Sequence, residues 1–257
     1  IEGIESVFGK DVPIIGGVSF DGKFVSDFQF IETNILEQSA VIVGLADSSL
    51  ELISQANHGL DIIEPPFEVT KAEYNHFFEL NGRNTWEILM EKLQLPLSTS
   101  PLEIFAYVTL AVEIPEECYE EYGSRHRVAV GLIPFEDGSM CSLIPCPEGT
   151  KFWLTRRNEQ KIFEGIDSIV ARVLKYLNGR IPVAILHADC ATRGKLLFNQ
   201  IMKDEIIKKL QYPICKDASI PWLGMYGGGE LTPLGGKNML QIYTSSLYVL
   251  VRRKELI

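Results

Sequence analysis

The stretch PVAILHADCATRG, residues 182–194, decides the fold class of this 257-residue chain. Its first part is continuously apolar, which is typical of a strand buried on both faces of a sheet, and polar residues follow directly. Residues 195–210 then predict a helix, and residues 220–226 predict a second strand. This order of strand, helix and strand favours a parallel pair of strands joined by a crossover helix.

Two further helices are predicted from the spacing of apolar residues. Residues 158–177 carry isoleucine, valine and leucine side chains at helical intervals, which gives the segment one buried face. A shorter helix is predicted over residues 85–93. Thr85 is either the N-cap of that helix or a plain surface residue.

Short apolar runs and turn dipeptides predict the remaining strands. Asn81-Gly82 predicts a turn after two short strands, and Asp137-Gly138 between two apolar runs predicts a hairpin. The predicted strands lie at residues 12–18, 40–45, 67–80 (as two strands), 103–112 and 240–251.

Two pairs of segments suggest an internal duplication. KDVPIIGG, from Lys10, resembles KDASIPWLGM, from Lys216, and SAVIVGL, from Ser39, resembles SSLYVLV, from Ser245. The matched positions lie 206 to 208 residues apart and in the same order. We therefore expect a mixed α+β form of the α/β class, with two related halves and mixed sheets flanked by helices.

The duplication also predicts how the chain is organised. The partner of the strand at Pro182 falls about 25 residues before Ile1, so an upstream segment is expected. LPLSTSP, residues 95–101, is the best candidate linker because prolines flank polar residues. It separates a predicted N-terminal part, residues 1–96, from a C-terminal part, residues 97–257.

Composition excludes several classes of function. The net charge is −10, whereas a protein that binds the phosphate backbone needs a basic face, so nucleic-acid binding is disfavoured. Five cysteines, an odd number, favour a reducing compartment, and we expect a cytoplasmic protein. The sequence contains no CxxC pair, so a structural zinc site is not expected. No apolar run is long enough to span a membrane. The acidic run at residues 113–121 is either a solvated loop or a surface for a cation or basic partner.

The glycine-rich stretch IPWLGMYGGGELTPLGGK, residues 220–237, does not fit a phosphate-binding loop. Asn238 stands where that motif needs Ser or Thr after Lys237, and the spacing of glycines does not fit a dinucleotide fingerprint. The next element is predicted to be a strand, so no helix N-terminus follows to bind phosphate. The stretch is therefore either a bulge or wide hairpin, or a pocket wall that presents Glu230.

Polar residues follow both strands of the predicted parallel pair. Since carboxyl ends of parallel strands meet at one sheet edge, these residues are expected to line one pocket. There Arg193 would bind a carboxylate, and Glu230 would bind an amine or orient Arg193. The candidate ligand-binding residues are Asp189, Cys190, Arg193, Gly224, Tyr226, Gly228, Gly229 and Glu230.

Each candidate also has a purely structural interpretation. Cys190 is either a small buried group or a nucleophile activated by Arg193, and Arg193 itself can pair with a structural acid. Asp189, like Thr192, can cap the following helix. His187 is either a core residue or a ligand, and Tyr226 can simply be packed.

The same residues resemble a known family. ADCATRG and the later PWLGMYGGGELTPLGG resemble the C-terminal part of FIST domains, named for F-box and intracellular signal transduction. Cys190 and Arg193 match a Ser-Cys-x-x-Arg turn in which Asp189 replaces the serine. The matching residues of a Gly-x-x-x-x-Gly-Glu loop are Gly224, Gly229 and Glu230. DVPIIGGVSFDG and residues 67–93 are similar to the end of the N-terminal FIST part.

This resemblance implies a non-catalytic sensory module. Such a module is expected to bind a small polar ligand such as an amino acid and to signal through a separate protein. No cofactor is expected, although some FIST proteins resemble haem-based nitric oxide sensors, for which the candidate haem ligand here is His187 or a neighbouring histidine. An enzyme that uses Cys190 and a purely structural scaffold are the further alternatives.

Overall fold

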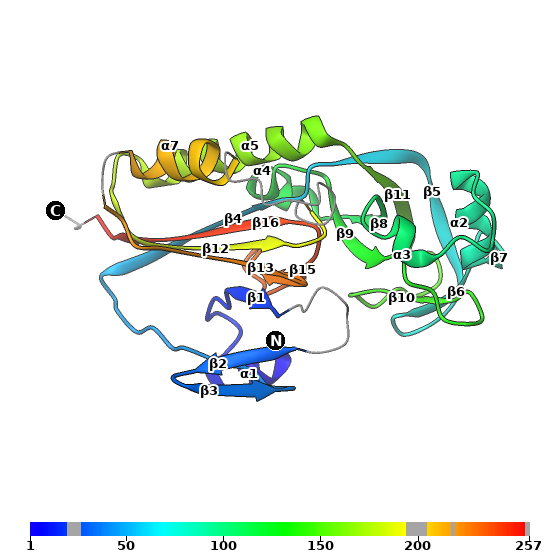
Figure 1. Ribbon diagram of the computed structural model, residues 1–257, viewed down its shortest axis with the longest axis horizontal. Helices are drawn as coiled ribbons and strands as arrows, with labels where there is room; N and C mark the ends of the chain where they lie inside the picture. Colours follow the sequence, from blue (N-terminus) through cyan, green and yellow to red (C-terminus); the bar gives the residue numbers. More distant parts are fainter. Residues whose placement is uncertain (20–26, 194–204, 217–218, 255–257) are drawn as a thin grey trace. The chain divides into compact units, whose positions relative to one another are not determined.

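A computed structural model describes residues 1–19, 27–193, 205–216 and 219–254 of the chain (Figure 1). Its contacts divide the chain into two compact units. Unit 1 contains Ile1–Asn57, Glu121–Gly123 and Phe163–Ile257, and unit 2 contains His58–Glu120 and Ser124–Ile162. These compact units differ from the two parts predicted at residues 1–96 and 97–257, and that division of the sequence into domains stays a prediction.

A four-stranded sheet forms the centre of unit 1. Its strand order is β13 (Trp222–Gly227), β12 (Pro182–Cys190), β16 (Ser245–Arg252) and β4 (Leu50–Asn57). β12 and β13 run parallel, whereas β16 is antiparallel to both β12 and β4. The parallel pair predicted from the sequence is confirmed.

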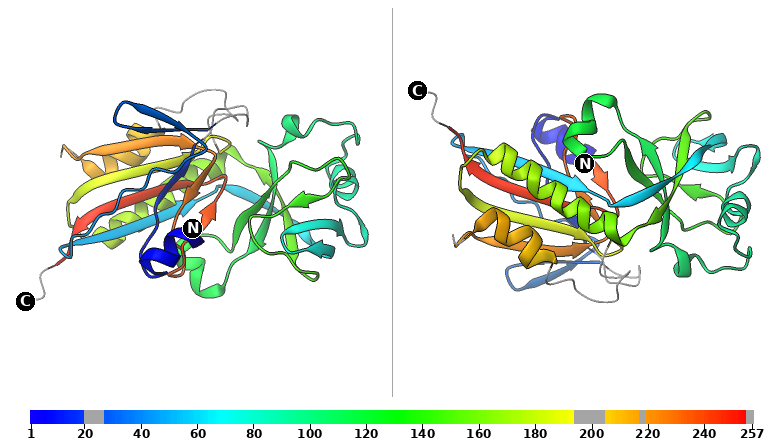
Figure 2. Two further views of the ribbon diagram at one scale, coloured as in Figure 1. Left: turned by 90° about the horizontal axis from the view of Figure 1, so that it is seen from below. Right: turned by 90° about the horizontal axis from the view of Figure 1, so that it is seen from above.

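Helices cover one face of this sheet, as Figure 2 shows. They are α5 (Glu159–Leu177), the π-helix η2 (Glu205–Gln211) and α7 (Tyr212–Cys215). Ile169 and Val173 of α5 pack with Ile185, Leu247 and Val249 of the sheet in one buried cluster. The helix predicted at 158–177 is therefore confirmed, while most of the helix predicted at 195–210 lies outside the described residues.

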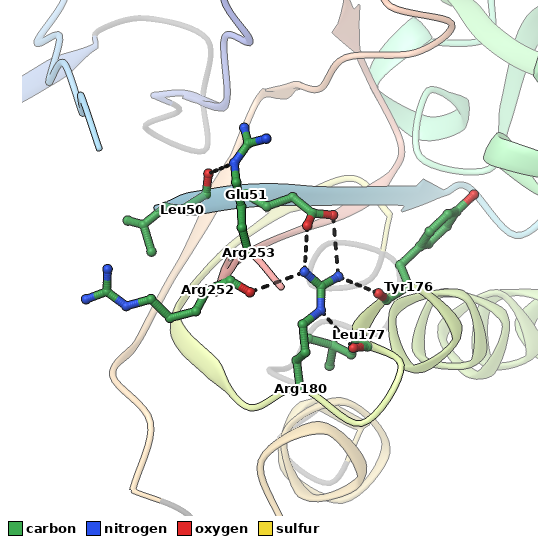
Figure 3. A network of polar contacts seen from close by, with 7 residues as sticks. All are labelled: Leu50, Glu51, Tyr176, Leu177, Arg180, Arg252 and Arg253. Carbon is green, nitrogen blue, oxygen red and sulfur yellow. Dashed lines mark hydrogen bonds and ion pairs between the residues drawn. The ribbon is translucent and has the colours of Figure 1, made fainter. Parts of the chain in front are cut away.

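Arg180 fastens the end of α5 to the edge of the sheet (Figure 3). Its guanidinium donates to the carbonyl oxygens of Leu177 and Tyr176, at 3.0 and 2.8 Å, in the last turn of the helix. It also donates to a Glu51 oxygen of β4 at 2.6 Å and to the Arg252 carbonyl of β16 at 3.2 Å. The hydrogen bond from Arg180 lowers the pKa of the Glu51 carboxyl. One side chain thus joins three elements.

A smaller sheet in unit 1 contains β1 (Gly16–Val18), β14 (Gly229–Leu231) and β15 (Leu240–Gln241), with β14 in the middle. The N-terminal part also holds α1 (Glu2–Phe8) and a hairpin of β2 (Phe28–Ile31) and β3 (Asn34–Glu37). The chain passes from β13 to β14 through the three consecutive glycines, so these residues join two sheets.

Unit 2 is built on a separate antiparallel sheet with the order β10-β6-β5-β11-β8-β9, and β7 pairs with β6. Phe77, Leu89 and Phe152 are central members of its buried core. The strands are β5 (Leu60–Glu73), β6 (His76–Leu80), β7 (Arg83–Asn84), β8 (Val108–Glu113), β9 (His126–Gly131), β10 (Met140–Cys141) and β11 (Lys151–Arg157). The helices near or within it are α2 (Thr85–Leu93), α3 (Pro101–Ile104), the 3-10 turn η1 (Glu116–Cys118) and α4 (Tyr119–Tyr122).

Two local predictions need correction in this unit. The N-cap of α2 is Asn84, whose Oδ1 accepts from the backbone N–H groups of Trp86 and Glu87, and Thr85 is buried in the first turn. The turn at Asp137-Gly138 is present, but β10 after it pairs with β6 rather than with the strand before it. The two apolar runs are thus not the arms of one hairpin, because each finds its partner elsewhere in the sheet.

The predicted strand at residues 40–45 is wrong, and the structure does not show the predicted duplication. Residues 40–45 form no strand, and their side chains are exposed, whereas the aligned segment from Ser245 forms the central strand β16. Of the strand predicted at 12–18, only β1 forms. An apolar run becomes a strand only where a neighbouring strand supplies hydrogen bonds, and that neighbour is not encoded locally.

Among the described residues, no helix is both long enough and apolar enough to cross a bilayer. This agrees with the short apolar runs of the sequence. The mixed α/β class, with antiparallel and mixed sheets beside helices, is confirmed.

Candidate functional site

The carboxyl ends of β12 and β13 lie side by side, as the parallel pairing requires. Asp189 is opposite Tyr226 in the register, and Cys190 is opposite Gly227. Beyond the last residue of β12, the Ala191 amide donates to the Gly227 carbonyl at 2.8 Å. The Asp-Cys-x-x-Arg turn and the glycine-rich segment therefore meet.

Asp189 and Arg193 form a buried ion pair within the turn. The Arg193 Nε and Nη2 atoms donate to the two carboxylate oxygens of Asp189 at 2.7 and 3.2 Å. The side chain of Arg193 is 2% exposed and that of Asp189 is 4% exposed. Each charge is costly to bury alone, so the pair holds the turn together, as the structural interpretation of Arg193 expected.

Cys190 is a buried thiol rather than an exposed thiolate. Its Sγ lies 2.9 Å from the Thr192 hydroxyl, and its backbone N–H donates to the Thr244 carbonyl at 2.9 Å. Burial, reinforced by the nearby Glu230 carboxyl, raises the pKa of the Cys190 thiol to about 12. At neutral pH the sulfur therefore keeps its proton.

Glu230 lies on the central strand of the small sheet, and its side chain is fully buried. The Thr244 hydroxyl donates to its Oε2 atom at 2.5 Å. Burial raises the pKa of the Glu230 carboxyl well above its usual range. The charge of Asp189 raises the Glu230 pKa further, and the charge of Arg193 lowers it. The buried position of Glu230 therefore disfavours the charged form of its carboxyl.

Three polar atoms beside this acid have no protein partner within the described residues. They are Oε1 of Glu230 and both side-chain atoms, Oε1 and Nε2, of Gln241. Gln241 is 1% exposed and lies directly opposite Glu230 in the register of β14 and β15. Leaving one buried polar group without a partner costs about 1–3 kcal/mol, so these atoms need water or a ligand.

The glycines allow backbones to approach closely. A Cβ atom at Gly227 would lie 2.6 Å from the Val18 carbonyl oxygen, and one at Gly229 would lie 2.9 Å from the Gln241 carbonyl oxygen. The Gly228 amide donates to Val18 O at 2.8 Å. Close approach of neighbouring backbones therefore explains Gly227 and Gly229, which lie at the two ends of the connection between β13 and β14.

Two further candidates, Gly224 and Tyr226, lie on β13. Gly224 is exposed and faces His187, two positions before Asp189, while Tyr226 is half-buried. His187 is a core residue, since it is buried and its Nε2 lies 2.9 Å from the Ser245 hydroxyl. Of the eight candidates, the structure gathers Asp189, Cys190, Arg193 and Glu230 around one buried polar cluster.

Sequence reasoning missed Thr244 and Gln241. Thr244 and the two serines after it form a polar run at the start of the apolar strand β16, and this run was a usable signal for Thr244. Gln241 had no such signal, because its position opposite Glu230 depends on strand register.

Two cavities lie away from this cluster. A cavity of about 300 Å³ is lined by Gln211, Tyr212, Cys215, Lys216, Ser219, Ile220 and Trp222. Another, of about 180 Å³, lies in unit 2. Neither lining includes Asp189, Cys190, Arg193 or Glu230. In the part of the chain that is described, no group of three His, Cys, Asp or Glu side chains is arranged to hold a metal ion.

Comparison with known proteins gives two domain matches. The FIST N domain matches residues 1–83, and the FIST C domain matches residues 86–233. Uncharacterized proteins of Mycobacterium bovis and Mycobacterium tuberculosis are each 24% identical over 243 residues, which is 93% of this chain. The chain spans 60% of the length of these relatives. No solved structure matches.

Proposed function

Because the chain belongs to the FIST family, a family of proposed sensory and signalling domains, we propose that it is a non-catalytic sensor for a small polar ligand. The proposed binding site is the polar cluster of Asp189, Cys190, Arg193 and Glu230, with Gln241 as a further member. The backbone at Gly228 and Gly229 would form its wall, and Gly224 and Tyr226 would lie at its outer edge.

One observation carries this proposal: the buried Glu230 and Gln241 side chains present polar atoms that no described protein group satisfies. A ligand that bonds to both residues would remove the cost of leaving them unpaired. An amino acid offers suitable groups, since its ammonium can donate to Glu230 and its carboxylate can accept from Gln241 Nε2. Arg193 already binds Asp189 with two hydrogen bonds, so it is assigned a positioning role.

The site favours binding over covalent catalysis. A nucleophilic cysteine needs a lowered pKa, and here burial raises the pKa of Cys190. A haem sensor using His187 is the other alternative, and it would require this buried side chain to become accessible to haem. A titration with haem that produced a Soret band sensitive to His187→Ala would favour that alternative.

The test is ligand-induced thermal stabilisation with the twenty standard amino acids as probes. A ligand at a hundred times its Kd stabilises the folded state by about 2.7 kcal/mol, so a real site gives a clear shift in Tm. Glu230→Gln keeps the shape of the side chain and should abolish the shift. Glu37→Gln, on the exposed strand β3, is the matched control and should retain it.

Two results would contradict the proposal: no stabilisation by any probe, or full stabilisation in Glu230→Gln. Arg193→Ala is a poor test, because it would leave the Asp189 carboxylate buried without a partner and weaken the fold itself. If the sensor signals, we propose that it acts in the cytoplasm through a separate protein.

A further inference from the structure

A second group of polar side chains lines the cavity of about 180 Å³ in unit 2. The cavity is lined by neighbouring strands β5 and β6, the residue that caps α2, and the turn that precedes β10, which a hydrogen bond joins to that cap. Its lining residues are Lys71, Phe78, Glu79, Asn84, Asp137 and Ser139. None of them belongs to the cluster around Glu230.

Two of these residues are fully engaged within the protein. Asn84 caps α2 through its oxygen and donates through Nδ2 to the Asp137 carbonyl at 2.8 Å. The Ser139 hydroxyl donates to Asp137 Oδ1 at 2.5 Å and lies 2.6 Å from His76 Nε2. Since its proton points to Asp137, Ser139 accepts from His76, which is the reverse of the activation that a serine nucleophile needs. The arrangement favours binding over hydrolysis.

The charged groups of three lining residues remain able to bind a ligand: Lys71, Glu79 and Asp137. Lys71 and Glu79 are directly opposite in the register of β5 and β6, yet no ion pair joins them within the described residues. The Lys71 Nζ lies instead 5.8 Å from the centre of the Phe78 ring. Asp137 uses only Oδ1 in its hydrogen bonds with Ser139, so Oδ2 is available. One hollow therefore presents a positive charge, two negative charges and an aromatic face.

The aromatic face is held in place by its neighbours. The His76 ring packs at a tilt against Phe78, with centroids 4.4 Å apart, and against Phe135, at 4.8 Å. A small ammonium group placed over Phe78 would meet the carboxylates of Glu79 and Asp137 and the negative face of the ring. A carboxylate on the same molecule would meet Lys71.

We propose that this hollow is a second binding site, specific for a small zwitterion, in which Lys71 binds the anionic group and Glu79 with Asp137 binds the cationic group. The site depends on unit 2 alone and is independent of the ligand proposed for unit 1. In the described part of the chain, Lys71 and Glu79 form no ion pair with each other, so each can pair with the opposite charge of the ligand.

The experiment is an NMR titration of the full chain with glycine and with 4-aminobutanoate, followed at the backbone amides of Phe78 and Glu79. Acetate and methylammonium serve as half-ligands. Saturable shifts are expected for at least one zwitterion, and Lys71→Met and Glu79→Gln should each weaken its binding about fivefold to tenfold. The amide shifts caused by acetate should disappear only in Lys71→Met, and those caused by methylammonium should disappear only in Glu79→Gln.

The sheet offers a matched control. Lys151 and Glu68 are also directly opposite on adjacent strands, but they do not line the hollow. Lys151→Met and Glu68→Gln should leave the titration unchanged, and so should Glu230→Gln in unit 1. The proposal is overturned if no zwitterion gives saturable shifts, or if the Lys151 and Glu68 variants weaken binding as much as the Lys71 and Glu79 variants do.

Discussion

Acid should destabilise unit 2 through one buried histidine, His58. Its Nδ1 accepts from the Leu60 amide at 3.0 Å, and its Nε2 lies 2.8 Å from the His126 carbonyl oxygen. These contacts require a neutral ring with its proton on Nε2, because a second proton would point at the Leu60 N–H group. Burial accordingly lowers the pKa of His58 from 6.5 to about 4.

The size and sign of the effect follow from this shift. As the pH falls below 6.5, the unfolded chain binds a proton at His58 that the folded chain does not, so stability is lost until the pH reaches about 4. A shift of this size corresponds to about 3 kcal/mol, which is a large part of the stability of an ordinary domain. Below pH 4 this contribution should stay constant.

Urea denaturation between pH 7 and pH 4 measures the effect. In a Trp222→Phe background the fluorescence comes from Trp86 and Trp153, which both belong to unit 2. His58→Asn keeps an acceptor for the Leu60 amide but cannot titrate. At pH 7 this variant should be about 1–3 kcal/mol less stable, because packing and one hydrogen bond are lost.

The decisive comparison is the difference between the two proteins at each pH. Carboxyl groups such as Asp61 and Glu113 also have lowered pKa values and contribute equally to both curves. The stability of wild type relative to His58→Asn should fall by about 3 kcal/mol between pH 6.5 and pH 4, so that at pH 4 the variant is as stable as wild type or more stable. Parallel curves over this range would refute the role given to His58.

Three other changes have direct readouts. Arg180→Met should lower the free energy of unfolding of unit 1 by about 1–3 kcal/mol in urea denaturation, because it removes the bonds joining α5 to β4 and β16; an unchanged midpoint would contradict this. Gly227→Ala should lower Tm by several degrees, at about 2–4 °C per kcal/mol, because the added Cβ would meet the backbone of β1. Gly224→Ala is the control, since its Cβ would make only ordinary contacts, and equal losses of Tm in the two variants would refute the explanation. Iodoacetamide should label exposed Cys141 much faster than Cys190 in the native state, and equal rates in a mass-spectrometric time course would contradict the buried thiol.

Elements with strong local patterns could be predicted from the sequence. The helices α5 and α2 match their predicted ranges within a residue, because their apolar faces repeat at helical spacing. The pair of β12 and β13 was predictable because the crossover rule leaves few ways to connect two such strands. The meeting of the Asp189 turn with the glycine-rich segment followed from that pair.

Features that depend on distant partners could not be predicted. Residues 40–45 have the composition of a strand but no pairing neighbour, while β16 has a neighbour on each side. The position of Gln241 opposite Glu230 is fixed by the register of β14 and β15, which the sequence does not reveal. Asn84 rather than Thr85 is the cap because the first helical residue is Thr85, so the side chain that reaches the free N–H groups of Trp86 and Glu87 is that of Asn84.

A crystal structure with an amino acid that stabilises the protein tests the central claim most directly. The account predicts ligand density with a polar atom about 2.7–3.2 Å from Glu230 Oε1 and a second polar contact to the Gln241 side chain. Ordered water alone at these atoms, with the stabilising ligand bound elsewhere, would contradict it.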